Sequence, residues 1–168
     1  MENISLLIID VDGTMTDGTV FYGDNNLEIK PFNIKDGAII TSLPKLGIDV
    51  VFLTGRISAA VERRASELGA VAVQGVCDKA LALGELLQKR VIEPDQCAYI
   101  GDDLNDCAAM KMCGFKACPA DAVSEIQKIC DFVSSFNGGH GAVREVCEYI
   151  LRRDGRYEDF LEFFEISM

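Results

Sequence analysis

The chain has 168 residues, of which 49% are hydrophobic and 26% are charged, and its formal net charge is -11. A chain of this length can bury a substantial core as one domain, and the composition is that of an ordinary globular protein. The acidic balance argues against nucleic-acid binding, which needs a basic surface. A few local cations can still bind an anionic substrate.

The apolar run at residues 4–9 is too short to cross a bilayer and has no basic segment before it, so we expect neither a membrane anchor nor a signal peptide. The seven cysteines are an odd number and include no CxxC pair, which favours reduced core thiols and a cytoplasmic location. The single histidine, His140, argues against a His-rich zinc site.

Strands and helices are predicted to alternate along the chain. Short apolar runs predict core strands, at residues 5–10, 49–53, 71–73, 96–100, 114–118 and 131–133. A β-hairpin is expected after the first strand, where residues 19–22 and 27–34 flank the turn-forming sequence GDNN. Helical spacing and capping residues predict helices, at residues 35–46, 58–68, 78–90, 105–112, 122–129 and 142–151.

This alternation predicts an α/β fold with one doubly wound, Rossmann-like parallel sheet, whose ligand site lies beyond the carboxyl ends of the strands. The interval between Asp12 and Thr54 has room for the hairpin and one helix but not for a cap domain. We therefore expect a single domain over residues 1–168, with a helical extension at 152–168. That extension either packs on its own core or contacts a partner, and the first alternative is favoured.

Four short motifs fall at predicted strand ends or helix starts. They are DVDGT at residues 10–14, TGR at 54–56, DK at 78–79 and GDDLND at 101–106. Each motif alone has an ordinary explanation, because aspartates commonly end strands or cap helices and a TG pair is a common turn. Their joint order indicates a phosphoryl-transfer site.

The chemistry of such a site assigns a role to each group. Asp10 can act as nucleophile and Asp12 as general acid and base. Thr54 offers a hydroxyl to the phosphoryl oxygens, and Lys79 a positive charge to the transferring group. Hard oxygen ligands for Mg²⁺ are expected from Asp102, with Asp103 and Asp106 as supporting acidic residues or simply as caps of the next helix.

On these motifs the chain resembles the haloacid dehalogenase superfamily of phosphatases, in its capless branch acting on 2-keto-3-deoxy sugar-acid phosphates. Longer matches to that branch are TDG at residues 16–18, FNIKDG at 32–37, TGRIS at 54–58, RRASELG at 63–69, QGVCDK at 74–79 and GGHGAVRE at 138–145. The resemblance covers about residues 4–151. It implies a magnesium-dependent hydrolase of lipopolysaccharide biosynthesis that works through an aspartyl-phosphate intermediate.

The resemblance also implies a set of site residues. Mg²⁺ would be held by Asp10, the backbone carbonyl of Asp12, and Asp102. The residues facing the substrate would be Asn33, Lys35, Asp36, Gly37, Arg56, Arg64 and Lys79. The protein would be a homotetramer with shared active sites, in which the hairpin seals sites between subunits. The residues contacting a neighbouring subunit would be Gly138, Gly139, His140, Gly141 and Arg144.

Alternatives remain for several of these residues and for the function. Arg64, next to Arg63, has the ordinary interpretation of a solvated helix face, and His140 that of an exposed loop residue. Arg56 suits the carboxylate of a sugar acid and favours an eight-carbon substrate, 3-deoxy-D-manno-octulosonate 8-phosphate. A nine-carbon 2-keto-3-deoxy acid 9-phosphate is the alternative substrate.

Two other functions are alternatives to hydrolysis. A receiver domain also places aspartates, a threonine and a lysine around Mg²⁺, but its order differs, because here Lys79 precedes the GDD motif. A non-catalytic partner of a cytidylyltransferase is the other possibility, and the intact set of catalytic groups argues against it.

Overall fold

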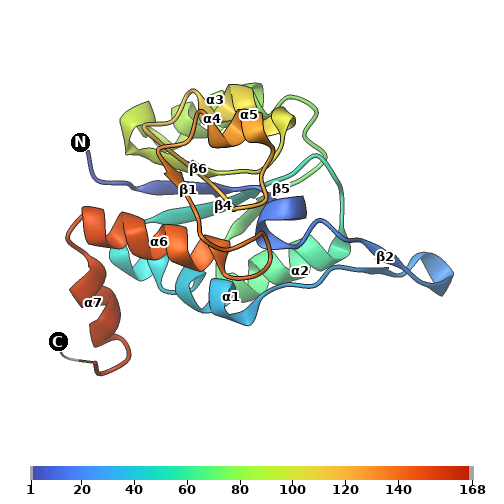
Figure 1. The fold of residues 1–168 in the computed structure, drawn as a ribbon, viewed down its shortest axis with the longest axis horizontal. Helices are drawn as coiled ribbons and strands as arrows, with labels where there is room; N and C mark the ends of the chain where they lie inside the picture. The colour runs from blue at the N-terminus through green and yellow to red at the C-terminus, as the bar shows by residue number, and fades with distance from the viewer. Residues whose placement is uncertain (1, 167–168) are drawn as a thin grey trace.

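The computed structural model describes residues 2–166. A parallel sheet forms the centre of the molecule, with strand order β5-β4-β1-β6-β7-β8 (Figure 1). The strands are β1 (Leu6–Ile9), β4 (Asp49–Leu53), β5 (Val71–Val73), β6 (Cys97–Ile100), β7 (Phe115–Cys118) and β8 (Phe132–Val133). This order confirms the predicted doubly wound sheet, because the chain winds from β1 first to one edge and then to the other.

Helices cover both faces of the sheet. One face carries α1 (Ile34–Ile40), α2 (Ala59–Leu68) and α6 (Ala142–Arg153), and the other α3 (Lys79–Arg90), α4 (Cys107–Met110) and α5 (Ser124–Gln127) (Figure 1). Successive residues of β1 point to opposite faces. Leu7 and Ile9 therefore enter the core beneath α1, α2 and α6, whereas Leu6 and Ile8 enter the core beneath α3 and α4.

The register of the sheet brings three strand ends together. Ile9, the last residue of β1, lies opposite Phe52 of β4 and Ile100 of β6. The polar residues that follow these strands, Asp10, Thr54 and Asp102, therefore emerge at one edge of the sheet. This edge is where a doubly wound sheet binds its ligands.

The predicted hairpin is present, with shorter strands than expected. It consists of β2 (Phe21–Tyr22) and β3 (Glu28–Ile29), paired antiparallel, and it projects from the body of the molecule (Figure 1). Asn25 in its tip has a left-handed backbone with φ 58°, a conformation that asparagine tolerates better than most residues. No cap domain occurs within residues 2–166.

Two of the predicted helices are each divided between an α-helix and a 3₁₀ turn in the structure. The helix expected at residues 35–46 ends with α1 at Ile40 and continues as a separate 3₁₀ turn, Leu43–Leu46. Pro44 explains the break, because proline lacks an N–H and disfavours a helical residue before it. The helix expected at residues 105–112 begins as a 3₁₀ turn, Leu104–Asp106, and continues as α4.

The C-terminal extension forms a helix, α7 (Tyr157–Glu162), that contacts α6. Phe160 is buried and belongs to the same core as α6, while Phe164 remains half exposed. Packing on its own core is therefore the alternative that the structure favours. Residues 167 and 168 of the predicted extension lie outside the described part of the chain.

The seven cysteines are free thiols, as expected, and Cys97, Cys113, Cys118 and Cys147 are buried. Among the helices described in residues 2–166, none combines the length and apolar character that crossing a membrane requires.

Candidate active site

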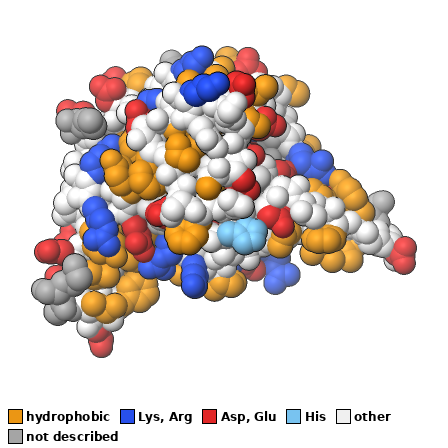
Figure 2. Space-filling model, viewed as in Figure 1, with side chains coloured by type: hydrophobic (Ala, Val, Ile, Leu, Met, Phe, Trp, Pro, Cys, Tyr) orange, Lys and Arg blue, Asp and Glu red, His pale blue; other side chains and the backbone are white. Residues whose placement is uncertain are grey.

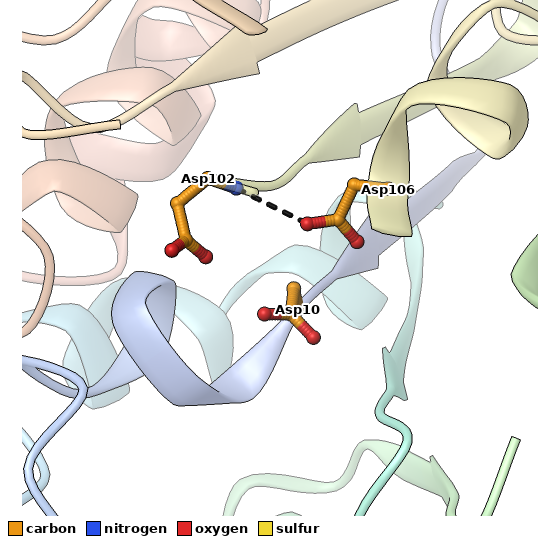
Figure 3. A group of neighbouring side chains, drawn as sticks. All are labelled: Asp10, Asp102 and Asp106. Atoms are coloured by element: carbon orange, nitrogen blue, oxygen red, sulfur yellow. Dashed lines mark hydrogen bonds between the residues drawn. The ribbon is translucent and has the colours of Figure 1, made fainter. Parts of the chain in front are cut away.

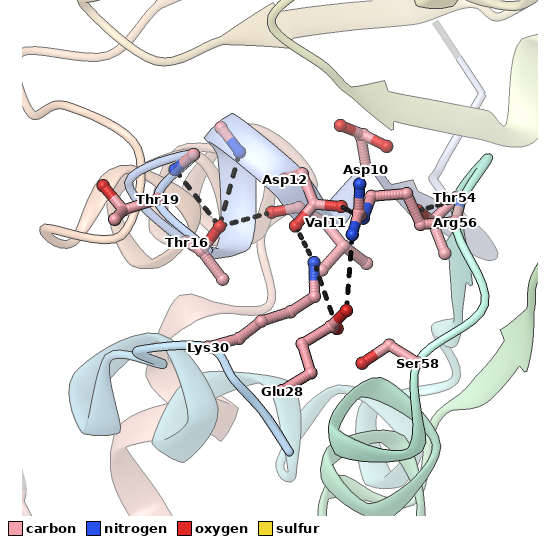
Figure 4. A network of polar contacts seen from close by, with 12 residues as sticks. Asp10, Val11, Asp12, Thr16, Thr19, Glu28, Lys30, Thr54, Arg56 and Ser58 are labelled. Carbon is pink, nitrogen blue, oxygen red and sulfur yellow. Dashed lines mark hydrogen bonds and ion pairs between the residues drawn. The ribbon is translucent and has the colours of Figure 1, made fainter. Parts of the chain in front are cut away.

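The first polar segment of the site follows β1 directly. Asp10 is 5% exposed, and its N–H donates to the carbonyl of Ile100 at 2.9 Å, which extends the sheet by one residue. The next turn, Val11–Met15, is interrupted by non-helical backbone at Asp12 and Gly13. This break sends the Asp10 and Asp12 side chains in different directions. Asp10 points toward Asp102 and Asp106, and Asp12 points toward the hairpin (Figures 3 and 4).

Asp10, Asp102 and Asp106 form a cluster in which the carboxylate oxygens lie within 4.8 Å of one another (Figure 3). Thr14 donates a 2.9 Å hydrogen bond to Oδ1 of Asp102 and so fixes that carboxylate. Three acidic groups at this spacing suit a divalent cation with hard oxygen ligands. The third carboxylate of the cluster is Asp106, which the sequence predicts as a supporting acidic residue, whereas the predicted contribution of Asp12 is its backbone carbonyl.

The two oxygens of Asp106 are already occupied by neighbouring donors. Its Oδ1 accepts from Lys79 Nζ and from the Tyr99 hydroxyl, each at 2.7 Å, and its Oδ2 accepts from the N–H groups of Asp102 and Asp103 at 3.2 and 3.3 Å. A carboxylate with its lone pairs filled in this way holds the surrounding loop more than it offers a ligand. Asp10 and Asp102 therefore fit a Mg²⁺ ion better than Asp106 does. Asp103 caps the 3₁₀ turn, its side chain accepting from the N–H of Leu104.

Lys79 connects the cluster to α3. Asp78 caps that helix as predicted, and the Lys79 ammonium donates to Oδ1 of Asp10 at 2.6 Å as well as to Asp106. Lys79 is 3% exposed. The hydroxyl of Tyr99 completes this buried network, and the sequence analysis did not identify it. The signal was a single hydroxyl-bearing residue in an otherwise apolar strand, CAYI.

Burial and mutual repulsion shift the titration of the cluster. Burial, and then the charge of Asp106, raises the pKa of Asp10 to about 8 despite the opposing effect of Lys79. Burial likewise raises the pKa of Asp102 to about 6, against the hydrogen bond from Thr14. Burial disfavours the charged form of Lys79, but Asp10 and Asp106 outweigh it and raise the pKa of that ammonium. The three carboxyl groups therefore carry more negative charge than Lys79 balances. A bound cation would balance the excess.

Asp12 belongs to a second polar network, made with the hairpin (Figure 4). The Lys30 ammonium, which is buried, pairs with Oδ1 of Asp12 and lies 3.8 Å from Oε1 of Glu28. Arg56 donates from Nη2 to Glu28 at 3.3 Å and to the Tyr22 hydroxyl at 2.6 Å. Lys30 is not among the site residues predicted from the sequence. Its signal was the alternation of Glu28 and Lys30 about Ile29, which puts opposite charges on one face of a strand.

Thr54 lies at the end of β4, next to Asp10 (Figure 4). Its N–H donates to the carbonyl of Val73 at 3.0 Å, and its hydroxyl accepts from the N–H of Arg56 at 3.3 Å. The residue is 2% exposed. This position fits the predicted contact of the Thr54 hydroxyl with a phosphoryl oxygen.

The residues around the start of α1 are engaged within the chain. Asn33 caps the helix, and its amide donates to the carbonyl of Gly139 at 3.2 Å. Asp36 is fully buried and accepts from the N–H of Arg144 at 2.8 Å. A side chain without exposed surface does not fit the predicted contact with substrate, so Asp36 ties α1 to α6 instead. A Cβ on Gly37 would lie 2.1 Å from Nη2 of Arg64, so this glycine makes room for that guanidinium.

The glycine-rich loop packs closely against the turn that follows β1. Gly138 is buried, and a Cβ there would lie 1.8 Å from the carbonyl oxygen of Gly13. Gly139 donates its N–H to the carbonyl of Thr14 at 3.0 Å, with φ 68°. These two glycines pack against the catalytic loop of their own chain, because only a residue without a side chain fits there. The contact with a neighbouring subunit that we expected of both residues stays a prediction, and Gly139 keeps part of its surface exposed.

The remaining predicted cations divide between two cavities, each of about 330 Å³. One lies between the starts of α1 and α6 and is lined by Lys35, His140, Gly141 and Arg144, among others. The other lies beneath the hairpin, between Lys30, Phe32 and Arg64. Arg64 and Lys35 thus line different cavities.

The chain is similar in sequence to known phosphatases. Residues 71–146 match the model of the haloacid dehalogenase-like hydrolases. The 3-deoxy-D-manno-octulosonate 8-phosphate phosphatase of Salmonella typhi is 42% identical over 159 residues, which are 94% of this chain and 85% of the relative. The enzyme of the same name from Escherichia coli K12 is 41% identical with the same coverage.

Solved structures match over nearly the whole chain. The phosphatase of that name from Moraxella catarrhalis, in complex with magnesium, phosphate and KDO, superposes with a TM-score of 0.92 at 41% identity, covering 96% of this chain and 93% of that one. The cobalt-bound enzyme from Haemophilus influenzae gives a TM-score of 0.89 at 38% identity, covering 94% and 93%. By this identity and coverage, the chain belongs to the haloacid dehalogenase-like hydrolases and, within them, to the family of the 3-deoxy-D-manno-octulosonate 8-phosphate phosphatases.

Proposed function

We propose that the chain is a Mg²⁺-dependent phosphatase that hydrolyses 3-deoxy-D-manno-octulosonate 8-phosphate through an aspartyl-phosphate intermediate. The observation that carries this proposal is the buried Asp10 carboxylate at the end of β1, held at 2.6 Å by Lys79 and adjacent to Asp102. The curated relatives bear the name of this activity. Lipopolysaccharide biosynthesis is the pathway in which such a reaction belongs.

In the first half of the reaction, an Asp10 oxygen attacks phosphorus and the bond from phosphorus to the sugar oxygen breaks. Asp12 donates a proton to that leaving oxygen. Lys79 orients Asp10 and places a positive charge beside the transferring group. Mg²⁺ held by Asp10 and Asp102 would reduce the repulsion between the two anions.

In the second half, water attacks the phosphorus of the aspartyl phosphate and gives a proton to Asp12. The bond between phosphorus and Asp10 breaks, which releases inorganic phosphate and restores the Asp10 carboxylate. Asp12 is then protonated and ready for the next leaving group. The buried Thr54 hydroxyl is available to the phosphoryl oxygens through both halves.

Arg56 is the residue we assign to the carboxylate of the sugar acid. Its guanidinium is about half exposed and lies at the hairpin side of Asp12, with Nε 3.8 Å from Oδ2. A planar guanidinium binds a carboxylate through two parallel hydrogen bonds. This supports the eight-carbon acid over a neutral sugar phosphate.

We also infer a homotetramer in which the hairpin covers a neighbouring active site. Phe21, Tyr22, Leu27 and Ile29 are each more than half exposed, and Figure 2 shows hydrophobic side chains gathered on the projecting hairpin. Exposed apolar surface of this kind marks an interaction site. A capless site needs such a cover to exclude water.

The test is phosphate release from a panel of sugar phosphates with and without Mg²⁺. We expect the highest kcat/KM on the eight-carbon acid phosphate, loss of turnover in EDTA, and no turnover in Asp10→Asn. Asp95→Asn, an exposed carboxylate in the turn Pro94–Gln96, is the matched control. Full turnover by Asp10→Asn would exclude the assigned nucleophile, and preference for a nine-carbon acid would exclude the assigned substrate.

A further inference from the structure

Lys30 is a buried cation without an assigned role. Its side chain has 0% exposure, and its ammonium lies between the carboxylates of Asp12 and Glu28. Lysine is almost never fully buried unless it is paired, and β3 ends one residue before it. The hairpin therefore inserts a positive charge against the loop that carries the catalytic aspartates (Figure 4).

The two carboxylate oxygens of Asp12 have different surroundings. Lys30 pairs with Oδ1, whereas Arg56 Nε lies 3.8 Å from Oδ2, which is too far for a hydrogen bond. The Asp12 side chain is about one-fifth exposed, so water reaches part of it. One oxygen is thus anchored, and the other is left to accept a proton.

We propose that Lys30 is a positioning residue that anchors Asp12 as the base for hydrolysis of the aspartyl phosphate. The inference rests on the proposed function and assigns it a residue from the hairpin. Without the ammonium, the carboxylates of Asp12 and Glu28 face each other across the vacated space, and like charges at this separation move apart. Water then attacks phosphorus with a poorly placed proton acceptor, while attack by Asp10 on a substrate with a good leaving group is unaffected.

The experiment follows p-nitrophenyl phosphate in rapid mixing, because p-nitrophenolate leaves without a proton and the first half-reaction then does not need Asp12. In Lys30→Met we expect a burst of nearly one p-nitrophenolate per active site, followed by steady turnover about tenfold below wild type. This loss is smaller than the roughly 10²–10⁴-fold contributed by an acid–base group itself, because Asp12 is still present. Intact-protein mass should reveal a phosphorylated enzyme that wild type does not accumulate to the same level. Lys89→Met, an exposed lysine at the far end of α3, should behave as wild type.

A double-mutant cycle with Asp12→Asn separates action through Asp12 from a general packing effect. If Lys30 acts through Asp12, Lys30→Met slows an Asp12→Asn enzyme no further, and the two losses do not multiply. Multiplying losses overturn the inference. So does slower turnover without a burst or phosphorylated enzyme, since defective packing would also slow the first half-reaction.

Two further measurements keep the test decisive. Thermal unfolding reports whether Lys30→Met folds. If it does not fold, Lys30→Gln replaces it, because this variant removes the charge but keeps a polar end. The same burst is expected of Lys30→Gln. Unchanged turnover in either folded variant overturns the inference. Turnover that survives Asp10→Asn would instead count against the proposed function itself, so the two failures can be told apart.

Discussion

A Cβ atom on Gly13 would lie 2.1 Å from Oδ2 of Asp102. The glycine and the aspartate follow different strands and are 89 positions apart in the chain. The Asp102 carboxylate can occupy its position only because Gly13 has no side chain. Gly13 also has φ 99°, a backbone that L side chains rarely adopt. The turn after β1 thus fixes both the direction of Asp10 and the space that Asp102 occupies.

Gly13→Ala is therefore expected to displace Asp102 and to reduce kcat/KM at least about a hundredfold, with a loss of about 1–3 kcal/mol from the strained backbone. Gly69→Ala is the matched control, since Gly69 has φ 69° but nothing within 4 Å of its Cβ position. It should lose similar stability and keep its activity. Steady-state kinetics and urea unfolding of both variants check this, and equal activity in the two would show that the space beside Asp102 is not limiting.

The raised pKa values of Asp10 and Asp102 predict how pH affects the metal-free protein. The Asp10 pKa is raised from 3.8 to about 8, so between these values the folded protein retains a proton that the unfolded chain has released. Stability from this group is then present below about pH 4 and is lost as pH rises toward 8. Asp102, with its pKa raised to about 6, acts in the same direction up to that pH.

Mg²⁺ should oppose this loss, because cation binding favours the charged carboxylates. The difference in melting temperature between samples with Mg²⁺ and with EDTA is expected to widen from pH 5 to pH 8. Differential scanning calorimetry at constant ionic strength measures it. A difference that stays constant or narrows with pH would contradict the assignment of these two aspartates to the metal.

The exposed hairpin gives a prediction about assembly. Ile29 is 51% exposed and pairs with Phe21 across the hairpin, so a charge at this position would have to be buried in a subunit contact. Ile29→Lys is expected to lower the molar mass in light scattering from that of a tetramer toward that of a monomer. Val91→Lys, 89% exposed at the end of α3, should leave the mass unchanged. An Ile29→Lys tetramer would exclude the hairpin as the contact.

The C-terminal helix gives a prediction about stability. Phe160 is 1% exposed, whereas Phe164, whose ring centroid lies 5.4 Å away, is 52% exposed. Phe160→Ala should cost about 3–5 kcal/mol through lost burial and the cavity it leaves. Phe164→Ala should cost about 1 kcal/mol, from the aromatic contact alone. Equal losses in urea unfolding would mean that α7 does not use Phe160 to pack on the core.

The positions of the catalytic groups could be predicted from the sequence because strands in a parallel sheet share a direction. Once Asp10, Thr54 and Asp102 each follow an apolar strand, their meeting at one edge follows from the pleat and the register. The helix caps were equally local: Asp78 accepts from the N–H of Leu81, as its place before the helical run indicates. These are consequences of short stretches of chain.

Other features depend on contacts between distant segments. The burial of Asp36 and the packing of Gly138 against Gly13 arise where α1, α6 and the catalytic loop meet, and a single sequence does not reveal which partner fills a given space. The same holds for Tyr99 and Lys30, whose polar atoms find carboxylates 7 and 18 residues away.

The sequence by itself thus determined the order of the catalytic groups, the α/β class and the lack of room for a cap. Tertiary structure alone decided which carboxylates remain free for a cation and which are consumed by neighbours. The reason is that hydrogen-bond donors such as Lys79 and Lys30 reach their acceptors through folding, and an oxygen already holding two donors has little capacity left for a metal.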